Sequence, residues 1–278
     1  MIRVDAHQHF WQYHPVRDSW ITEDMSVIRR DFMPEDLEPL LAANGLDGCV
    51  LVQTDQSDDH TDWLLTLAEK HDFIKAVVGW TDLQSPDVKE KLSAYKKHKK
   101  LKGFRHILQG EQQRSFMLRH EFKNGIRQLA NFGFTYDILI YPDQLRYTEL
   151  LVKEYPDQPF VIDHLAKPYI RSNKIDEWRK EINAVARYPN VSCKLSGMVT
   201  EADWKTWTKE SFRPYLDVVV NAFGVDRLLF GSDWPVCLVA ASYADVVGII
   251  RDYFSAFSEQ EQAKVFGSNA VNFYNINN

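Results

Sequence analysis

Four side chains that could bind a metal ion or activate water come directly after short apolar segments of the sequence. His7 and His9 follow residues 2–6, and His164 and Asp233 each follow a later apolar run. Residues two apart on a β-strand point to the same face, so both imidazoles of the first pair can converge on one point. A histidine pair alone is more often structural, but a third histidine and an aspartate at other strand ends favour a catalytic role.

These residue types leave two kinds of chemistry open. Neutral imidazoles and a carboxylate suit Zn²⁺ or a similar divalent ion, which would activate water and polarise a carbonyl group. Without a metal, the histidines could hold a carbonyl or a carboxylate, and Asp233 could act alone as a general base. The residue pattern does not decide between one metal ion and none.

The elements that must position these residues are short strands that alternate with helices. Apolar runs rich in β-branched residues predict strands at residues 2–6, 48–53, 76–80, 101–107, 135–140, 159–165, 191–195 and 227–230. Continuous apolar strands separated by amphipathic helices predict a parallel sheet covered by helices. Eight such units in 278 residues favour an α/β fold with a single closed (β/α)₈ TIM-type barrel over residues 1–278. No linker or shift in composition marks a domain boundary.

Capping signals predict the ends of several helices. Ser85-Pro86 predicts a helix start, because proline favours the first turn, and Ser258 with Glu261 forms a capping box. Glycine ends three further predicted helices in the way that a left-handed terminus prefers. These helices are residues 34–41 before Gly45, 119–132 before Gly133, and 211–223 before Gly224.

One long irregular segment, residues 10–33, separates the first strand from the first helix. On the catalytic face of a barrel, a loop of this length is a candidate lid or substrate wall. Alternatively, its aromatic residues simply cover the barrel mouth: Phe10, Trp11, Tyr13, Trp20 and Phe32.

Five more residues at the strand ends are candidates for substrate binding, because barrel active sites collect at the carboxyl ends of the strands. They are Gln53, Trp80, Arg105, His106 and Trp234. Each has a structural alternative: Gln53 as a structural amide, the two tryptophans as caps of the barrel, and His106 as a packed histidine. We favour a substrate role for Arg105, since a guanidinium group suits carboxylate oxygens, over an ion pair with Asp163 or Asp137.

Two aspartates are expected to orient the imidazoles. Asp163 precedes His164, and Asp5 lies two residues before His7. Carboxylates beside ligating histidines fix the ring orientation and the tautomer.

Several motifs together resemble a known family over essentially the whole chain. They are His7-Gln8-His9-Phe10-Trp11, Val161-Ile162-Asp163-His164-Leu165-Ala166-Lys167-Pro168, Lys194-Leu195-Ser196-Gly197, Phe230-Gly231-Ser232-Asp233-Trp234-Pro235 and Ser268-Asn269-Ala270-Val271-Asn272-Phe273-Tyr274. The sequence resembles the amidohydrolase superfamily, and within it the amidohydrolase-related branch of sugar-acid lactonases, which includes L-fuconolactone and L-rhamnonolactone hydrolases.

The resemblance implies roles for the matching residues. Asp233 would be the general base for the attacking water, and His7, His9 and His164 would hold a metal ion or the substrate carbonyl. The sequence departs from the two-metal pattern of the superfamily, because the fifth and seventh strand ends carry no histidine. What remains is a single site formed by His7, His9, His164 and Asp233, with zinc or without a metal.

The composition limits the partners. The chain is 45% hydrophobic and 26% charged, with a net charge of −6, which argues against nucleic acid. Its apolar runs are shorter than the ~18 residues that span a bilayer, so we expect no membrane association. Cys49, Cys193 and Cys237 lie in apolar runs without CxxC spacing, and residues 2–6 form a strand rather than a signal peptide. We therefore expect a cytoplasmic protein, a homodimer whose other partner is a small-molecule lactone.

These observations predict a hydrolase of carboxylic esters that opens a sugar-acid lactone to the aldonic acid with water activated by Asp233. The alternative is a metal-dependent decarboxylase of an aromatic or enoic acid on the same barrel. A third reading is a sugar-acid binding protein without catalysis.

Overall fold

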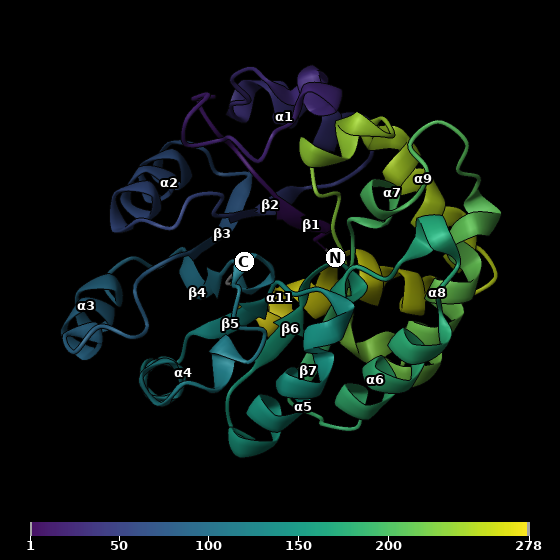
Figure 1. Cartoon of the computed structure of the whole chain (residues 1–278). Coiled ribbons are helices and arrows are strands. Elements are labelled where there is room, and N and C mark those ends of the chain that lie inside the picture. Colours follow the sequence, from purple (N-terminus) through teal and green to yellow (C-terminus); the bar gives the residue numbers. More distant parts are fainter. Residues whose placement is uncertain (1, 277–278) are drawn as a thin grey trace.

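Parallel strands form a ring at the centre of the molecule, and helices surround it (Figure 1). The computed structural model describes residues 2–276. Within these residues, a single sheet contains eight strands in sequence order: β1 (Val4–Gln8), β2 (Gly48–Val52), β3 (Ile74–Gly79), β4 (Leu101–His106), β5 (Thr135–Ile138), β6 (Phe160–Ile162), β7 (Val191–Leu195) and β8 (Leu228–Phe230). All seven neighbouring pairs are parallel. The predicted (β/α)₈ barrel is confirmed.

The ring closes between β1 and the residues that follow β8. Gln8 forms a parallel bridge with Trp234. The backbone N–H of Asp233 donates to the carbonyl of His7 at 2.8 Å, and the N–H of His9 donates to the carbonyl of Trp234 at 2.7 Å. This closure places the catalytic candidates of the first and last strands side by side.

Helices form the outer layer of the barrel. The α-helices in the described part of the chain are α1 (Pro34–Ala43), α2 (Asp58–Lys70), α3 (Val88–Tyr95), α4 (His120–Phe132), α5 (Leu145–Glu154), α6 (Asp176–Ala186), α7 (Met198–Glu201), α8 (Lys209–Phe223), α9 (Tyr243–Phe254), α10 (Glu259–Ala263) and α11 (Asn269–Phe273). In residues 2–276, no helix combines the length and the apolar character needed to cross a membrane.

Short helical turns complete the connections. The 3₁₀ turns are η1 (Glu23–Ile28), η2 (Leu108–Gly110), η3 (Phe116–Leu118), η4 (Pro142–Gln144), η5 (Asp163–Ala166), η6 (Ile170–Ser172), η7 (Val225–Arg227) and η8 (Val236–Val239), and η9 (Lys264–Ser268) is a π-helical turn.

Most predicted helix ends are confirmed, with one correction. The capping box at Ser258 is present, and α4 ends at Gly133 in the left-handed region. Gly224 also ends its helix with φ +67°, although its ψ of 163° lies outside the left-handed helical region. Helix α3 begins at Val88, later than predicted, because the Ser85 hydroxyl bonds to the Asp87 carboxylate and caps no helical N–H.

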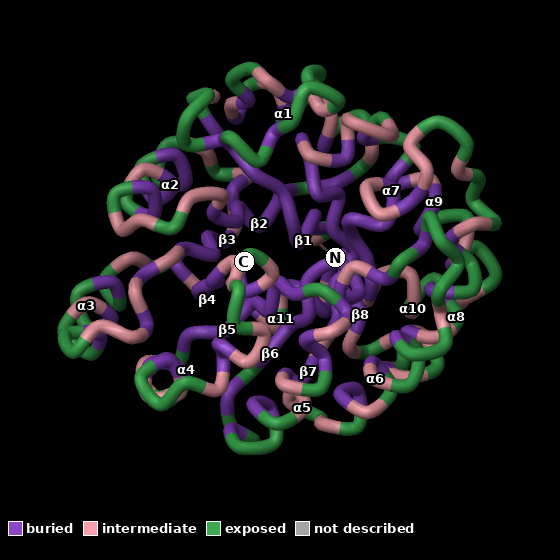
Figure 2. Tube along the Cα trace, viewed as in Figure 1, coloured by how far each residue is buried: buried purple, intermediate pink, exposed green. Residues whose placement is uncertain are grey.

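The interior of the barrel is a tightly buried apolar cluster (Figure 2). It joins alternate residues of the strands to the C-terminal segment: Val4, Ala6, Val50, Val52, Ala76, Val78, Val161, Leu229, Ala270, Tyr274 and Ile276. The segment that includes α11 lines a cavity together with Lys102 and Thr135, which stand at the amino ends of β4 and β5. It therefore closes the face of the barrel opposite the strand carboxyl ends.

The long segment 10–33 is a packed wall in the structure. Trp11 and Phe32 form an antiparallel bridge, and η1 packs against η8. Phe10, Trp11 and Phe32 are buried, whereas Trp20 is 41% exposed. The aromatic residues thus bind this segment to the loop after β8.

Candidate active site

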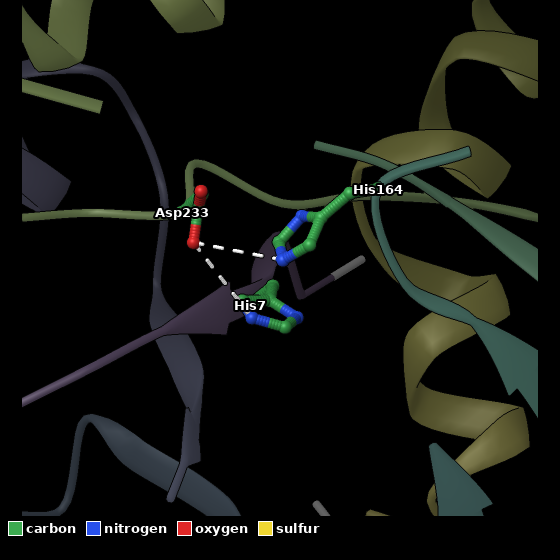
Figure 3. Close-up of side chains that lie close together, drawn as sticks. All are labelled: His7, His164 and Asp233. Carbon is green, nitrogen blue, oxygen red and sulfur yellow. Dashed lines mark ion pairs between the residues drawn. The ribbon is translucent and has the colours of Figure 1, made fainter. Parts of the chain in front are cut away.

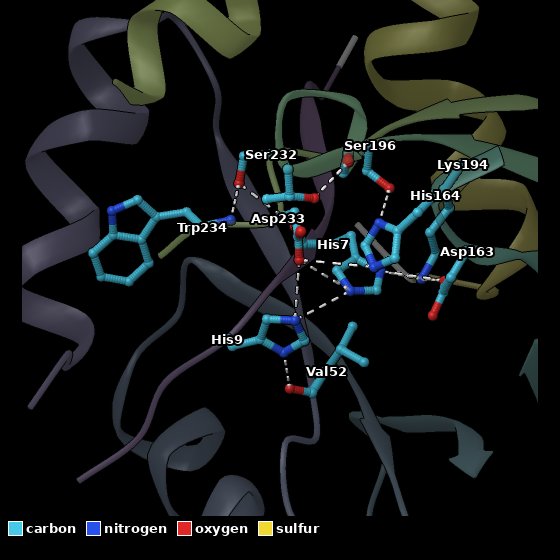
Figure 4. Close-up of polar contacts among 12 residues, drawn as sticks. His7, His9, Val52, Asp163, His164, Lys194, Ser196, Ser232, Asp233 and Trp234 are labelled. Carbon is cyan, nitrogen blue, oxygen red and sulfur yellow. Dashed lines mark hydrogen bonds and ion pairs between the residues drawn. The ribbon is translucent and has the colours of Figure 1, made fainter. Parts of the chain in front are cut away.

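The strand ends bring the four candidate residues to one point: Figure 3 shows His7, His164 and Asp233, and Figure 4 adds His9. His7 is the last residue but one of β1, His9 follows the strand, His164 lies in η5, and Asp233 follows β8. The Oδ1 atom of Asp233 is 3.4 Å from Nε2 of His9, 3.8 Å from Nε2 of His164 and 3.9 Å from Nε2 of His7. All four residues are at most 4% exposed. The structure therefore brings together the complete predicted catalytic set.

The second ring nitrogen of each histidine points away from this centre (Figure 4). Nδ1 of His9 lies 2.7 Å from the carbonyl oxygen of Val52, which can only accept a hydrogen bond. Nδ1 of His164 lies 2.8 Å from the Ser196 hydroxyl. The Val52 contact favours a proton on Nδ1 of His9 and leaves its Nε2 lone pair directed toward Asp233.

The orienting carboxylates differ from those predicted. Asp163 contacts His7 rather than its sequence neighbour, with Oδ1 3.2 Å from Nδ1. Asp5 holds backbone instead of an imidazole: its Oδ1 accepts from the N–H of His7 at 3.1 Å and of Ser232 at 2.9 Å. The hydroxyl of Tyr243 donates to the other oxygen of Asp5 at 2.9 Å. Asp5 thus ties β1 to the loop after β8.

A left-handed turn sets the position of His164. Residues 164–167 have φ values of 54°, 54°, 59° and 51°, although none of them is glycine. Such backbone costs roughly 1–2 kcal/mol per residue and persists only where the surroundings hold it. Here the indole N–H of Trp178 donates to the carbonyl of Leu165 at 2.8 Å, and Gly197 packs directly on the His164 ring.

A buried lysine extends the site below His7. Nζ of Lys194 lies 3.0 Å from Nδ1 of His7, 3.0 Å from Oδ1 of Asp163 and 2.5 Å from Oδ2 of Asp137. Arg105 donates to the other oxygen of Asp163 at 3.1 Å. Two cations therefore face two carboxylates, and this balance is what makes their complete burial tolerable.

The electrostatics favour neutral imidazoles beside an ionised aspartate. Burial lowers the pKa of His164 to about 4 and also lowers the pKa values of His7 and His9. Burial alone would raise the pKa of Asp233, but His164 and the two other histidines hold it below its ordinary value. At neutral pH the centre thus presents lone pairs and a negative charge, the donor set of a divalent cation.

The contact between the first two histidines is a specific test of that fit. Nε2 of His7 and Nε2 of His9 are 3.2 Å apart. Two ring nitrogens at this distance need a proton or a metal cation between them, and nitrogen ligands of a tetrahedral zinc ion stand about 3.4 Å apart. Ligand atoms of His7, His164 and Asp233 also lie within 4.8 Å of one another. The residues present therefore fit a single zinc ion.

Two residues that were predicted to bind substrate, Gln53 and Arg105, instead contact each other. Gln53 is fully buried; its Oε1 accepts from Nη2 of Arg105 at 2.9 Å, and its amide donates back to the Arg105 carbonyl at 3.3 Å. These contacts favour the structural alternative for Gln53, which holds the arginine. Arg105 itself pairs with Asp163 and is 3.3 Å from Nε2 of His7, the structural alternative that we did not favour.

The two tryptophans have different environments. Trp80 is half-buried, and its indole donates to Nδ1 of His106 at 3.3 Å, while Nε2 of His106 contacts Glu111 at 2.8 Å. His106 therefore supports Trp80 rather than standing in the open. Trp234 is 1% exposed because Phe10 and Phe32 cover its ring. This packing favours the structural alternative for Trp234, a cap of the barrel, over contact with substrate.

Two charged residues near the centre were not predicted. Lys167 follows the left-handed turn, and its Nζ lies 3.6 Å from Glu201 on α7; their side chains are 17% and 21% exposed. Burial raises the pKa of Glu201, and the charge of Asp233 adds to that effect. Lys167 stood in a quoted motif without a role. Glu201 follows no strand directly, so position along the chain gave no signal for it.

The fold and this centre define a hydrolase barrel of the amidohydrolase type. The chain belongs to the amidohydrolase family, whose model matches residues 4–276. An L-fucono-1,5-lactonase from Burkholderia multivorans is 38% identical over 98% of this chain and 96% of that protein. An L-fucono-1,5-lactonase from Burkholderia ambifaria is 36% identical over 99% and 96%, respectively. The crystal structure of a Burkholderia multivorans amidohydrolase with bound zinc superposes with a TM-score of 0.97 at 37% identity, covering 100% of both chains.

Proposed function

We propose that this protein hydrolyses a sugar-acid lactone of the L-fucono-1,5-lactone type to the open hydroxy acid. The observation that carries the proposal is the convergence of three Nε2 atoms on one oxygen of Asp233 at the carboxyl ends of the barrel strands. Two L-fucono-1,5-lactonases that are similar over nearly the whole chain support the substrate class.

The residues of this chain supply the proton transfers. The ionised Asp233 takes a proton from water as the oxygen attacks the lactone carbonyl carbon. Its shortest contacts with the three histidines use Oδ1, so Oδ2 is the oxygen that we propose receives the proton. The bond from the carbonyl carbon to the ring oxygen then breaks, and Asp233 returns the proton to the leaving ring oxygen. The products are a hydroxyl group and a carboxylic acid, which ionises.

We further propose that His7, His9, His164 and Asp233 hold one zinc ion. When bound, zinc lowers the pKa of water and polarises a carbonyl group. The zinc-bound amidohydrolase at 37% identity supports the choice of metal. The left-handed turn and Ser196 keep His164 aimed at the same point as the β1 histidines.

Substrate recognition is assigned to residues around this centre. The half-buried ring of Trp80, fixed through His106, packs on an apolar face of the sugar ring. Lys167 and Glu201 are partly exposed and offer a cation and a carboxylate to the hydroxyl groups. Arg105 stays with Asp163 and raises the positive potential beside the reacting carbonyl.

The test is a panel of aldonolactones assayed by acid release, with the purified protein, after chelator treatment, and after zinc is added back. We expect turnover of 1,5-lactones of the L-fucono type, loss with chelator and recovery with zinc. Carbon dioxide release from aromatic or enoic acids would instead support the decarboxylase. Tight binding of lactones without acid release would support the binding protein.

Location and assembly are proposed on narrower grounds. We propose a cytoplasmic enzyme, because Cys49, Cys193 and Cys237 are all buried and free, as in proteins of a reducing compartment. The homodimer remains a prediction, which light scattering of the purified protein checks directly.

A further inference from the structure

The C-terminal segment reaches into the barrel from the face opposite the catalytic centre. Tyr274, directly after α11, is 1% exposed and belongs to the apolar cluster of the barrel interior. Lys102 at the start of β4 donates to the carbonyl of Asn275 at 2.9 Å and fixes the segment at this face. The hydroxyl of Tyr274 nevertheless donates to Oδ2 of Asp137 on β5 at 2.8 Å.

A continuous chain of contacts leads from this hydroxyl to a catalytic histidine. Oδ2 of Asp137 accepts from Tyr274 and, at 2.5 Å, from Nζ of Lys194. The same Nζ lies 3.0 Å from Nδ1 of His7. Asp137, Lys194 and His7 are 0% exposed, so no bulk water competes with these contacts. In residues 2–276, Oδ1 of Asp137 has no hydrogen-bond partner, and Oδ2 alone carries both bonds.

The charges around Asp137 give the Tyr274 hydroxyl an electrostatic role in addition to its packing. Lys194 faces Asp137 from β7, while Asp163 from the end of β6 adds a second negative charge. Burial raises the pKa of Asp137 to about 6, although Lys194 opposes this effect and the Tyr274 hydroxyl helps to keep the carboxylate ionised. Without that hydroxyl, Asp137 would take up a proton nearer neutral pH and release its hold on Lys194.

We propose that Tyr274 is a positioning residue of the active site: through Asp137 it keeps Lys194 seated against His7. The inference rests on the proposed lactonase, in which His7 is part of the catalytic centre. The C-terminal segment, which closes the far end of the barrel, would thus help to position a catalytic histidine.

Tyr274→Phe is the first test, because it keeps the buried ring and removes only the hydroxyl. Replacing a direct partner of a metal-binding histidine costs 10- to 100-fold, so a group two contacts further away should lower kcat by about three- to tenfold. KM should stay within about twofold, since Tyr274 touches no substrate. The acidic limb of the kcat profile should also move to higher pH. Tyr136→Phe is the matched control: this hydroxyl is equally buried on β5 but has no partner in residues 2–276, and its removal should leave kcat unchanged.

A double-mutant cycle decides the route. Asp137→Asn removes the charge that Tyr274 is proposed to fix, so adding Tyr274→Phe to this variant should lower kcat no further. If kcat and its pH profile are unchanged in the single Tyr274→Phe variant, the hydroxyl has only a structural role and the proposal is wrong. Additive losses in the double variant would contradict the route through Asp137. Thermal unfolding curves, recorded for every variant, must show a folded protein at the assay temperature.

A second readout separates this inference from the proposed function. Zinc affinity is measured by competition with a chromophoric chelator, without any substrate. Tyr274→Phe should bind zinc more weakly than the parent and the Tyr136→Phe control. If the parent protein opens no lactone, the proposed function fails, and the zinc affinities alone judge the inference; equal affinities would then overturn it.

Discussion

At the scale of single residues, the catalytic types were predictable but their partners were not. His7, His9, His164 and Asp233 could be placed together because each follows an apolar run that had to be a strand of one closed sheet. The partners of these side chains depend on burial, because buried polar groups must be paired. Gln53 follows a strand too, yet it turns to Arg105 because an unpaired guanidinium group inside the barrel would be costly.

Asp233→Asn should abolish most turnover while the fold survives. General-base catalysis contributes on the order of 10²- to 10⁴-fold, so kcat should fall by that amount. Asp233 has φ +57°, which asparagine tolerates well, so thermal stability should change little. Zinc content, measured in parallel, separates loss of the base from loss of the metal. Asp226→Asn is the control, because within residues 2–276 its side chain forms only an exposed ion pair with Lys264. Near-normal kcat in Asp233→Asn would remove Asp233 from the reaction.

At the scale of elements, apolar runs predicted every strand, but the boundary of β6 was wrong for an instructive reason. The run 159–165 continues past the strand, which ends at Ile162, because four non-glycine residues then adopt left-handed backbone. The residue types do not predict such a turn, because tertiary contacts rather than local preferences stabilise it. The same element carries His164, so the least predictable backbone of the barrel lies at its active site.

Gly197→Ala should disturb this element specifically. A Cβ atom at Gly197 would lie 2.6 Å from Nδ1 of His164, so the ring must move away from the centre. We expect kcat to fall by about 10-fold or more, in line with the cost of disturbing a histidine's supporting contacts. Gly133→Ala is a matched control: with φ +69° and ψ 35° it lies in the same left-handed region as Gly197, and the nearest atom to its new Cβ is Nζ of Lys96 at an ordinary 3.5 Å. Both variants should lose about 1 kcal/mol of stability from backbone strain, and only the first should lose activity. Equal kcat values would show that His164 tolerates displacement.

At the scale of the whole molecule, burial shifts the pKa values of titratable groups in both directions, downward for histidines and upward for two aspartates. Burial lowers the pKa of His60 and of His164 to about 4, and it also lowers those of His7 and His9. The unfolded chain binds protons at these four histidines near pH 6.5, whereas the folded chain resists them. Burial also raises the pKa values of Asp5 and Asp137 to about 6, so the folded chain takes up two protons that the unfolded chain does not.

The difference fixes how stability depends on pH. Below about pH 6.5 the unfolded state protonates these histidines while the folded state resists, so the free energy of unfolding should fall as the pH is lowered from 7 to 5. Urea unfolding at pH 5, 6 and 7 checks this expectation. His60→Gln should flatten the dependence, because one of the four resisting histidines is gone. A free energy of unfolding that is constant from pH 7 to pH 5 would mean that the histidines do not remain neutral in the folded protein.

The closure of the ring has a consequence for how the enzyme is made. The backbone of Ser232 bonds to Asp5 across 227 residues, and the N–H of Asp233 bonds to the carbonyl of His7. During translation, one hydrogen-bonding edge of β1 therefore stays unpaired until the last strand has been synthesised. A polypeptide interrupted before that strand would carry the histidines of β1 but neither a closed sheet nor a base. Prematurely terminated chains of this protein should thus be inactive and prone to associate through that edge, which makes them natural substrates for chaperones and proteases.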